Sequence, residues 1–171
     1  MPALLINLAD VQLQARPADY TPPPDTAQRI AMQLGRIGSL LGLQHLGCSL
    51  VEVPPGKQAF PFHSHWHNDE LFVVLSGQGE LRFGPSRQPL REGDVVGCPA
   101  GGPDTAHAIT NTGSTALRYL AFSSQRTPEV CEYPDSRKTA WYDDRPGPDG
   151  ALQAHHVVVR DGQVVDYWDG E

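Results

Sequence analysis

The residues best suited to chemistry in this sequence are histidines and a glutamate that fall in one short stretch. His63 and His65 stand two positions apart in a run that has the character of a strand. Because side chains alternate along a strand, both imidazoles are expected on the same face, with their ring nitrogens close together. Two imidazoles placed in this way form a chelating pair for a metal ion.

Glu70 follows the pair but is an odd number of residues from His65, so a straight strand would direct it to the opposite face. The polar segment His67-Asn68-Asp69 can supply a turn or bulge that returns the carboxylate to the histidine face. The residues after it, Leu71 to Leu75, are apolar and predict a strand buried on both faces. A carboxylate beside such a strand is costly to bury without a cation or hydrogen-bond donors, and a metal ion would explain it.

The spacing of these residues resembles the motifs of a known protein family. Its first motif, with a glycine, a His-x-His pair, a glutamate and a second glycine, resembles the first motif of the cupins, and a later segment resembles the second. The matching residues are Gly56, His63, His65, Glu70 and Gly77, and then Gly93, Pro99, Gly101, His107 and Asn111. The resemblance covers about residues 46–124. It implies an all-β cupin jelly-roll barrel that coordinates one metal ion through His63, His65, Glu70 and His107.

The sequence departs from the family pattern in two places. The gap between glycine and histidine in the first motif is longer by one residue, and Gly102-Pro103-Asp104 lengthens the second motif before His107. Loops tolerate insertions, so these departures concern the loop geometry more than the ligands. Segments around Tyr133-Pro134-Asp135-Ser136 and at residues 167–171 also resemble small bacterial cupins, some of which carry labels such as sugar-phosphate isomerase.

The expected ligand set suits a divalent transition metal. Three imidazoles and a carboxylate fit Zn, Fe, Ni or Mn, whereas Ca and Mg prefer mostly oxygen ligands. Four protein ligands would leave open positions for water or an oxygen-containing substrate. The alternative is a polar, hydrogen-bonded pocket that holds no ion. His67 shares the parity of the pair, so it is either an alternative ligand or, as we favour, a residue at the rim.

The rest of the chain predicts short strands with frequent turns and suggests three segments. These are an N-terminal arm with leading strands or a short helix (1–45), the barrel with both motifs (46–124), and a C-terminal loop and hairpin tail (125–171). Pro22-Pro23-Pro24 predicts an extended connector, and the arm either is solvated or lies along a neighbouring subunit. Residues 26–43 fit short strands or a broken helix equally well.

Three further strand assignments follow from the pattern. Residues 60–67 alternate and predict a strand in which Phe60 and Phe62 face away from the histidine pair. Residues 125–150 are rich in Pro, Asp and Gly and are expected to be irregular. Residues 156–160 and 163–168 flank Asp161-Gly162, a dipeptide suited to a type I′ turn, and predict a hairpin.

Composition narrows the environment and the partners. The net charge of −7 without a Lys/Arg cluster argues against nucleic acid or an anionic membrane as the partner. Three widely spaced cysteines do not form a disulfide framework, and no segment has the features of a signal peptide or a membrane span, so a cytoplasmic protein is expected. Cupins are often dimers, and the resemblance therefore implies a homodimer.

The function expected from these residues is that of a metal-dependent enzyme acting on a small oxygen-rich metabolite, either isomerase-like or dioxygenase-like. The alternative is a non-catalytic cupin that binds or senses a small ligand. No residue outside the ligand set identifies itself as a general base, so the catalytic residues are unknown at this stage. His45, His155 and His156 are expected at the surface or in packing, Cys98 in the core, and Asn111 in a structural role.

Overall fold

The protein is described by a computed structural model in which residues 4–16, 21–146, 152–160 and 163–164 are placed. The chain is nearly all β, as the sequence predicted. Its strands are β1 (Gln33–Gly35), β2 (Leu46–Val53), β3 (Ser64–His65), β4 (Glu70–Ser76), β5 (Gln78–Phe83), β6 (Ser86–Arg91), β7 (Val95–Cys98), β8 (His107–Asn111), β9 (Leu117–Ser124), β10 (Glu129–Tyr133), β11 (Lys138–Pro146), β12 (Leu152–Arg160) and β13 (Gln163–Val164). The helical elements are η1 (Leu8–Asp10), α1 (Pro24–Ala27), α2 (Ile37–Leu40) and η3 (Pro103–Thr105).

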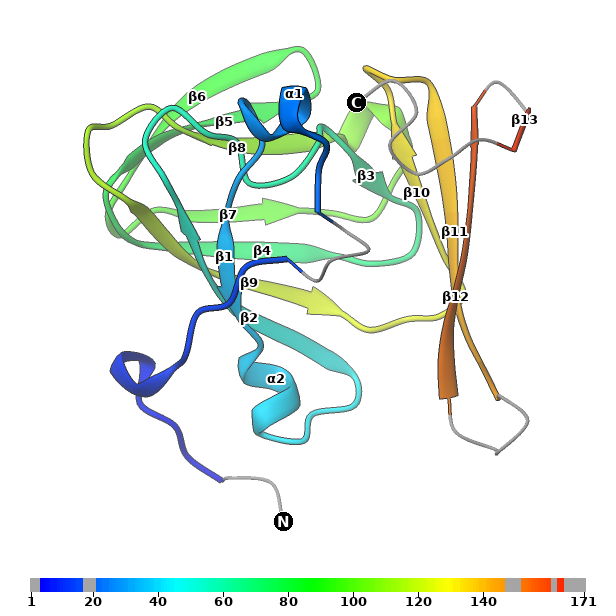
Figure 1. Cartoon of the computed structure of the whole chain (residues 1–171), viewed down its shortest axis with the longest axis horizontal. Coiled ribbons are helices and arrows are strands. Elements are labelled where there is room, and N and C mark those ends of the chain that lie inside the picture. Colours follow the sequence, from blue (N-terminus) through cyan, green and yellow to red (C-terminus); the bar gives the residue numbers. More distant parts are fainter. Residues whose placement is uncertain (1–3, 17–20, 147–151, 161–162, 165–171) are drawn as a thin grey trace.

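The strands form three sheets. One has the order β1-β2-β9-β4-β7, a second the order β6-β5-β8, and a third the order β13-β12-β11-β10-β3. The first two enclose the main core, while the long β11–β12 ribbon stands along one side of them (Figure 1). The named strands that pair within these sheets run antiparallel.

The main core is built from the inward faces of the first two sheets. Val51 and Val53 of β2, Phe72 and Val74 of β4, and Leu81 of β5 are all buried there. They alternate with residues of the opposite face, as strands that line a barrel must. Each fully buried side chain of this size contributes roughly 1.5–3 kcal/mol by leaving water.

The outer face of β2 is covered by the N-terminal arm. Leu50 is fully buried against Val11 and Ile37, so β2 is apolar on both faces where the arm crosses it. Backbone hydrogen bonds between Gln14 and Leu34 fix the arm to β1. Val11 and Gln14 of the arm therefore pack on its own barrel, whereas Leu4 and Leu5 before them are exposed.

Several local predictions need correction. The expected strand over residues 60–67 is reduced to the two residues of β3, and Leu71 of β4 is exposed rather than buried. Residues 26–43 contain both a short strand, β1, and a one-turn helix, α2. Pro24 starts α1 instead of extending the connector, because proline is tolerated at the first position of a helix.

The C-terminal region departs most from expectation. Residues 125–150 were expected to be irregular, yet they contain β10 and the start of the β11–β12 ribbon. The predicted hairpin is present as β12 paired with β13, while its Asp161-Gly162 turn and residues 165–168 lie outside the described residues. Within the described part of the chain, no helix has the length and apolar character needed to cross a membrane.

Candidate metal centre

The four residues named from the sequence come together at one corner of the barrel, each from a different local setting. His65 lies on β3, Glu70 opens β4 and His107 opens β8. His63 precedes β3 and is held by two backbone hydrogen bonds to His107, of 3.1 and 2.8 Å. The chelating pair therefore arises from a bridge to the second motif and not from the longer strand that the alternation suggested.

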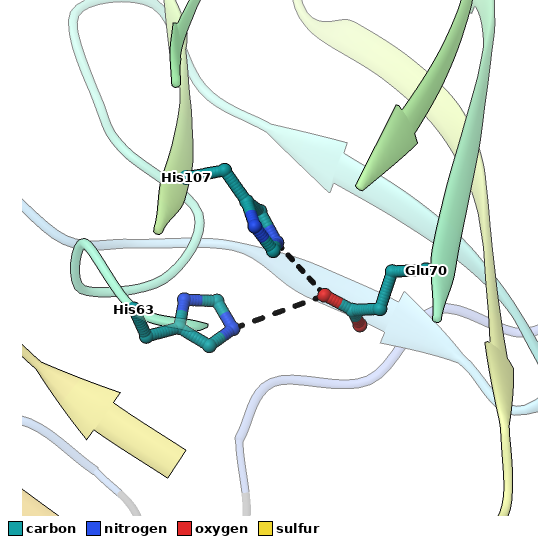
Figure 2. A group of neighbouring side chains, drawn as sticks. All are labelled: His63, Glu70 and His107. Atoms are coloured by element: carbon teal, nitrogen blue, oxygen red, sulfur yellow. Dashed lines mark hydrogen bonds and ion pairs between the residues drawn. The ribbon is translucent and has the colours of Figure 1, made fainter. Parts of the chain in front are cut away.

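One carboxylate oxygen lies at the centre of the group. Glu70 Oε2 is 2.8 Å from His107 Nε2, 3.4 Å from His65 Nε2 and 4.0 Å from His63 Nε2. Figure 2 shows how His63 and His107 converge on this carboxylate. Ligand atoms of His63, Glu70 and His107 all lie within 4.8 Å of one another, and His65 Nε2 lies 3.4 Å from the same carboxylate oxygen.

The Nδ1 side of each imidazole is already occupied, which directs Nε2 inward. His63 Nδ1 lies 2.8 Å from the Pro61 carbonyl, and His107 Nδ1 lies 3.3 Å from the Thr105 carbonyl. A carbonyl can only accept, so the Nδ1 of each of these two rings carries a hydrogen and Nε2 is the atom turned toward Glu70. An Nε2 atom turned into the site is the one that could ligate a metal ion.

Burial and contacts among the clustered residues determine their pKa values and therefore their charges. Burial and the neighbouring His107 and His65 lower the pKa of His63 to about 3, so this imidazole is neutral. Burial would raise the pKa of Glu70, but the hydrogen bond from His107 and the charges of the histidines outweigh it and lower the pKa to about 2. Burial also disfavours the charged form of His65, yet Cys131, Glu129 and Glu70 together raise its pKa to about 11.

Strand β10 supplies site residues that the sequence did not identify. Glu129, Cys131 and Tyr133 alternate along it and are buried on the face that meets the histidines. Cys131 pairs with His65 across the β3–β10 ladder, and the Tyr133 ring stacks on His63 with centroids 6.0 Å apart. The alternation in Glu129-Val130-Cys131-Glu132-Tyr133 was the available signal, but the surrounding Pro, Asp and Gly residues obscured it.

Next to the four side chains is a cavity of about 720 Å³. Its wall includes His63, His65 and Glu70 at one side and residues of β10 at another. Arg16 of the N-terminal arm also lines it, with its guanidinium 4.7 Å from the Phe60 ring centroid and a hydrogen bond of 2.7 Å to the Ala59 carbonyl. Phe60 was expected to face away from the histidines, but its ring lies 6.2 Å from that of His63.

The remaining sequence candidates fall outside the cluster. His67 is half exposed and contacts Glu129 rather than Glu70. His45, His155 and His156 are exposed, and Cys98 is buried in the main core. Asn111 is fully buried and holds the barrel together, since its amide donates to the Val53 and Thr115 carbonyls and accepts from the Gly113 amide.

A comparison with known protein families finds a match that covers the residues of this site. The cupin domain matches residues 49–123, which include all four clustered residues. The chain contains a cupin domain. Its strands beyond residue 123, including β10, lie outside the match.

Two curated proteins are similar to the cupin domain. An oxalate-binding protein from Thermotoga maritima is 32% identical over 71 residues, 42% of this chain and 55% of that protein. An uncharacterized protein from Methanocaldococcus jannaschii is 31% identical over 77 residues, 44% of this chain and 58% of that protein. The similarity thus spans little more than half the length of these relatives.

Solved structures resemble more of the chain. A candidate sugar phosphate isomerase from Acidithiobacillus ferrooxidans superposes with a TM-score of 0.71 at 25% identity, covering 89% of this chain and 91% of that one. A cupin-superfamily sugar phosphate isomerase from Silicibacter pomeroyi gives 0.74 at 23% identity, covering 95% and 97%. These likenesses establish the jelly-roll fold of the chain. They cover the C-terminal sheet as well as the barrel.

The donor set is chemically suited to a transition-metal ion. Imidazole nitrogens with free lone pairs and an ionised carboxylate are the ligands that such ions prefer. Their convergence around one oxygen beside a cavity is what a metal site with open positions requires. The His/Glu cluster could therefore hold a metal ion with room for a small ligand beside it.

Proposed function

We propose that this cupin binds one divalent transition-metal ion, such as Zn, Fe, Ni or Mn, through His63, His65, Glu70 and His107. The observation that carries the proposal is the approach of three Nε2 atoms to within 4.0 Å of Glu70 Oε2. Without a cation, this arrangement gathers several buried polar groups, which have lost their solvation, around one carboxylate oxygen. A metal ion would satisfy them all.

We further propose an enzyme that acts on a small oxygen-rich metabolite, isomerase-like or dioxygenase-like. The metal would supply Lewis acidity or a place for dioxygen beside the substrate. The chain's own contribution is the cavity, whose wall combines the Tyr133 ring with the cation of Arg16. Arg16 favours a substrate with an anionic oxygen group, because guanidinium pairs well with carboxylate and phosphate. Relatives named for sugar phosphate and for oxalate are consistent with that class.

A second candidate is a non-catalytic cupin that captures a small ligand. The similarity to an oxalate-binding protein favours it, and so does the lack of an obvious general base among the described residues that line the cavity. Tyr133 directs its hydroxyl to the Tyr142 hydroxyl at 3.1 Å, and the carboxylate of Glu129 accepts hydrogen bonds from several donors.

We also expect the protein to be cytoplasmic and homodimeric. Gel filtration with light scattering would test the dimer.

Elemental analysis of protein purified without chelators tests the metal, beside His63→Ala and His107→Ala variants. We expect one equivalent of a transition metal in the wild type and a loss of at least roughly tenfold in affinity in each variant. A folded wild type that takes up no stoichiometric metal, even after reconstitution, would refute the proposal. The metal-loaded protein is then assayed with aldose and ketose phosphates and with oxalate, where turnover supports an enzyme and binding without turnover supports the second candidate.

A further inference from the structure

Glu129 is a buried carboxylate that lies outside the matched cupin domain and beside a candidate ligand. It opens β10, is only 6% exposed, and places Oε2 at 3.5 Å from His65 Nδ1. Nδ1 of His65 faces the Glu129 carboxylate and the Cys131 thiol of β10, whereas Nδ1 of His63 and of His107 faces a backbone carbonyl. The orientation of His65 is therefore decided by β10.

The carboxylate is held firmly in this position. Backbone amides of His67 and Val130 donate to its Oε1 at 3.1 and 2.6 Å, and the Asn68 amide donates to its Oε2. Asn68 is itself buried and receives hydrogen bonds from Ser124 and from the Arg126 amide. A side chain fixed from several sides can fix another, because it loses little further freedom in doing so.

The same contacts span the segment between two candidate ligands. His67 and Asn68 belong to the turn that joins His65 to Glu70, the turn that returns the carboxylate to the histidine face. Glu129 thus contacts both the imidazole of His65 and the backbone that leads to Glu70. One residue of the C-terminal sheet therefore contacts the segments that carry two of the four groups.

We propose that Glu129 is a positioning residue for the metal centre, which holds His65 with Nδ1 protonated toward β10 and Nε2 toward the ion. This inference rests on the proposed metal site and adds that the C-terminal sheet, beyond the cupin domain itself, sets its affinity. A carboxylate that accepts from the distal nitrogen also makes the imidazole a better donor to a metal. Removing such a partner typically lowers metal affinity by about 10–100-fold.

Cys131 is the competing partner, because its Sγ lies 3.2 Å from the same Nδ1. A thiol is a weak acceptor, whereas an ionised carboxylate makes hydrogen bonds about twice as strong as neutral ones. We therefore assign the directing role to Glu129. The two residues can be separated by single substitutions, since Cys131→Ala leaves the carboxylate in place.

The test measures the dissociation constant of Co(II) by competition with a chelator at several pH values, so that proton competition at His65 is accounted for, together with the Co(II) absorption spectrum. Glu129→Gln keeps the size of the side chain, and Glu129→Asp keeps the charge but withdraws it from His65. We expect affinity to fall by about 10–100-fold in Glu129→Gln, with a shifted spectrum in the fully loaded protein and partial recovery in Glu129→Asp. The spectrum reports on the donor strength of His65, which a purely structural role would leave unchanged.

Three control variants are matched to the alternatives. Glu80→Gln removes a carboxylate that pairs with Arg87 away from the site, His67→Ala removes the exposed partner of Glu129, and Cys131→Ala removes the competing thiol. We expect Glu80→Gln to keep Co(II) affinity within about threefold of the wild type, and we expect Cys131→Ala and His67→Ala to lose less affinity than Glu129→Gln. Wild-type affinity and spectrum in Glu129→Gln, or a larger loss in Cys131→Ala or His67→Ala, would overturn the assignment. A wild type that binds no Co(II) would instead refute the proposed metal site.

Discussion

Metal binding should release a proton from His65, and the structure determines how strongly this depends on pH. In the metal-free protein the carboxylates of Glu70 and Glu129 flank this imidazole, and its pKa is raised to about 11. His65 is then protonated at neutral pH, and a cation can bind Nε2 only after that proton leaves. His63 and Glu70, with pKa values of about 3 and 2, have no proton to release there.

The size of the effect follows from the distance between the pKa and the working pH. Four pH units separate about 11 from 7, which costs roughly 5 kcal/mol of apparent binding free energy at neutral pH. As the pH rises toward 9, the apparent affinity for the metal should increase about tenfold per unit, because one proton competes with one ion.

Isothermal titration in buffers of different ionisation enthalpy measures this proton directly. We expect about one proton released by His65 for each metal ion bound at pH 7. Chelator competition between about pH 6.5 and 8.5 should give the matching slope in affinity. A release close to zero, with an affinity that does not vary over this range, would refute the reasoning about His65.

Three further predictions concern stability. The metal-free protein should lose stability as pH falls from about 6.5 toward 3, because His63 binds a proton in the unfolded chain but stays neutral in the folded protein, where its pKa is about 3. Glu70, whose pKa is lowered from 4.5 to about 2, adds to this loss of stability below pH 4.5. Urea titrations at several pH values would measure both effects. Asn111→Ala removes the three hydrogen bonds of a fully buried side chain and should lower the free energy of unfolding by about 3 kcal/mol, whereas a loss within error would contradict the role given to this side chain. Gly77→Ala should cost about 1–3 kcal/mol, because Gly77 has a φ of +89° and a Cβ there would lie 2.6 Å from the Ala116 carbonyl oxygen. Gly97→Ala, where a Cβ would meet nothing within 4 Å, serves as the control in thermal unfolding.

The sequence predicted the cluster better than it predicted the way the cluster is held. The resemblance to two motifs named His63, His65, Glu70 and His107, and the structure brings these four side chains together. The reason given for His63 was wrong in detail: an isolated bridge to His107 places it, since the residues before it do not continue β3. Such a bridge joins positions 44 apart in the chain, and no local periodicity records it.

The residues that β10 contributes to the site were not predicted, for a related reason. Glu129, Cys131 and Tyr133 alternate in burial as a strand does, but the neighbouring Pro, Asp and Gly residues favoured an irregular segment. What makes β10 a strand is its pairing with β11 on one side and β3 on the other. Both pairings are tertiary contacts, and tertiary contacts override local propensity in sheets.

The assignment of the clustered residues to different sheets has a mechanical consequence. His65 belongs to the sheet of β10–β13, Glu70 to the five-stranded sheet that contains β4, and His107 to the three-stranded sheet that contains β8. An ion bound to all of them would act as a cross-link between three separately hydrogen-bonded sheets at their common corner. The ladder between β3 and β10 contains only two residue pairs. Loading the ion should therefore protect the junction between the C-terminal sheet and the barrel from proteolytic cleavage more than it protects any other part of the fold.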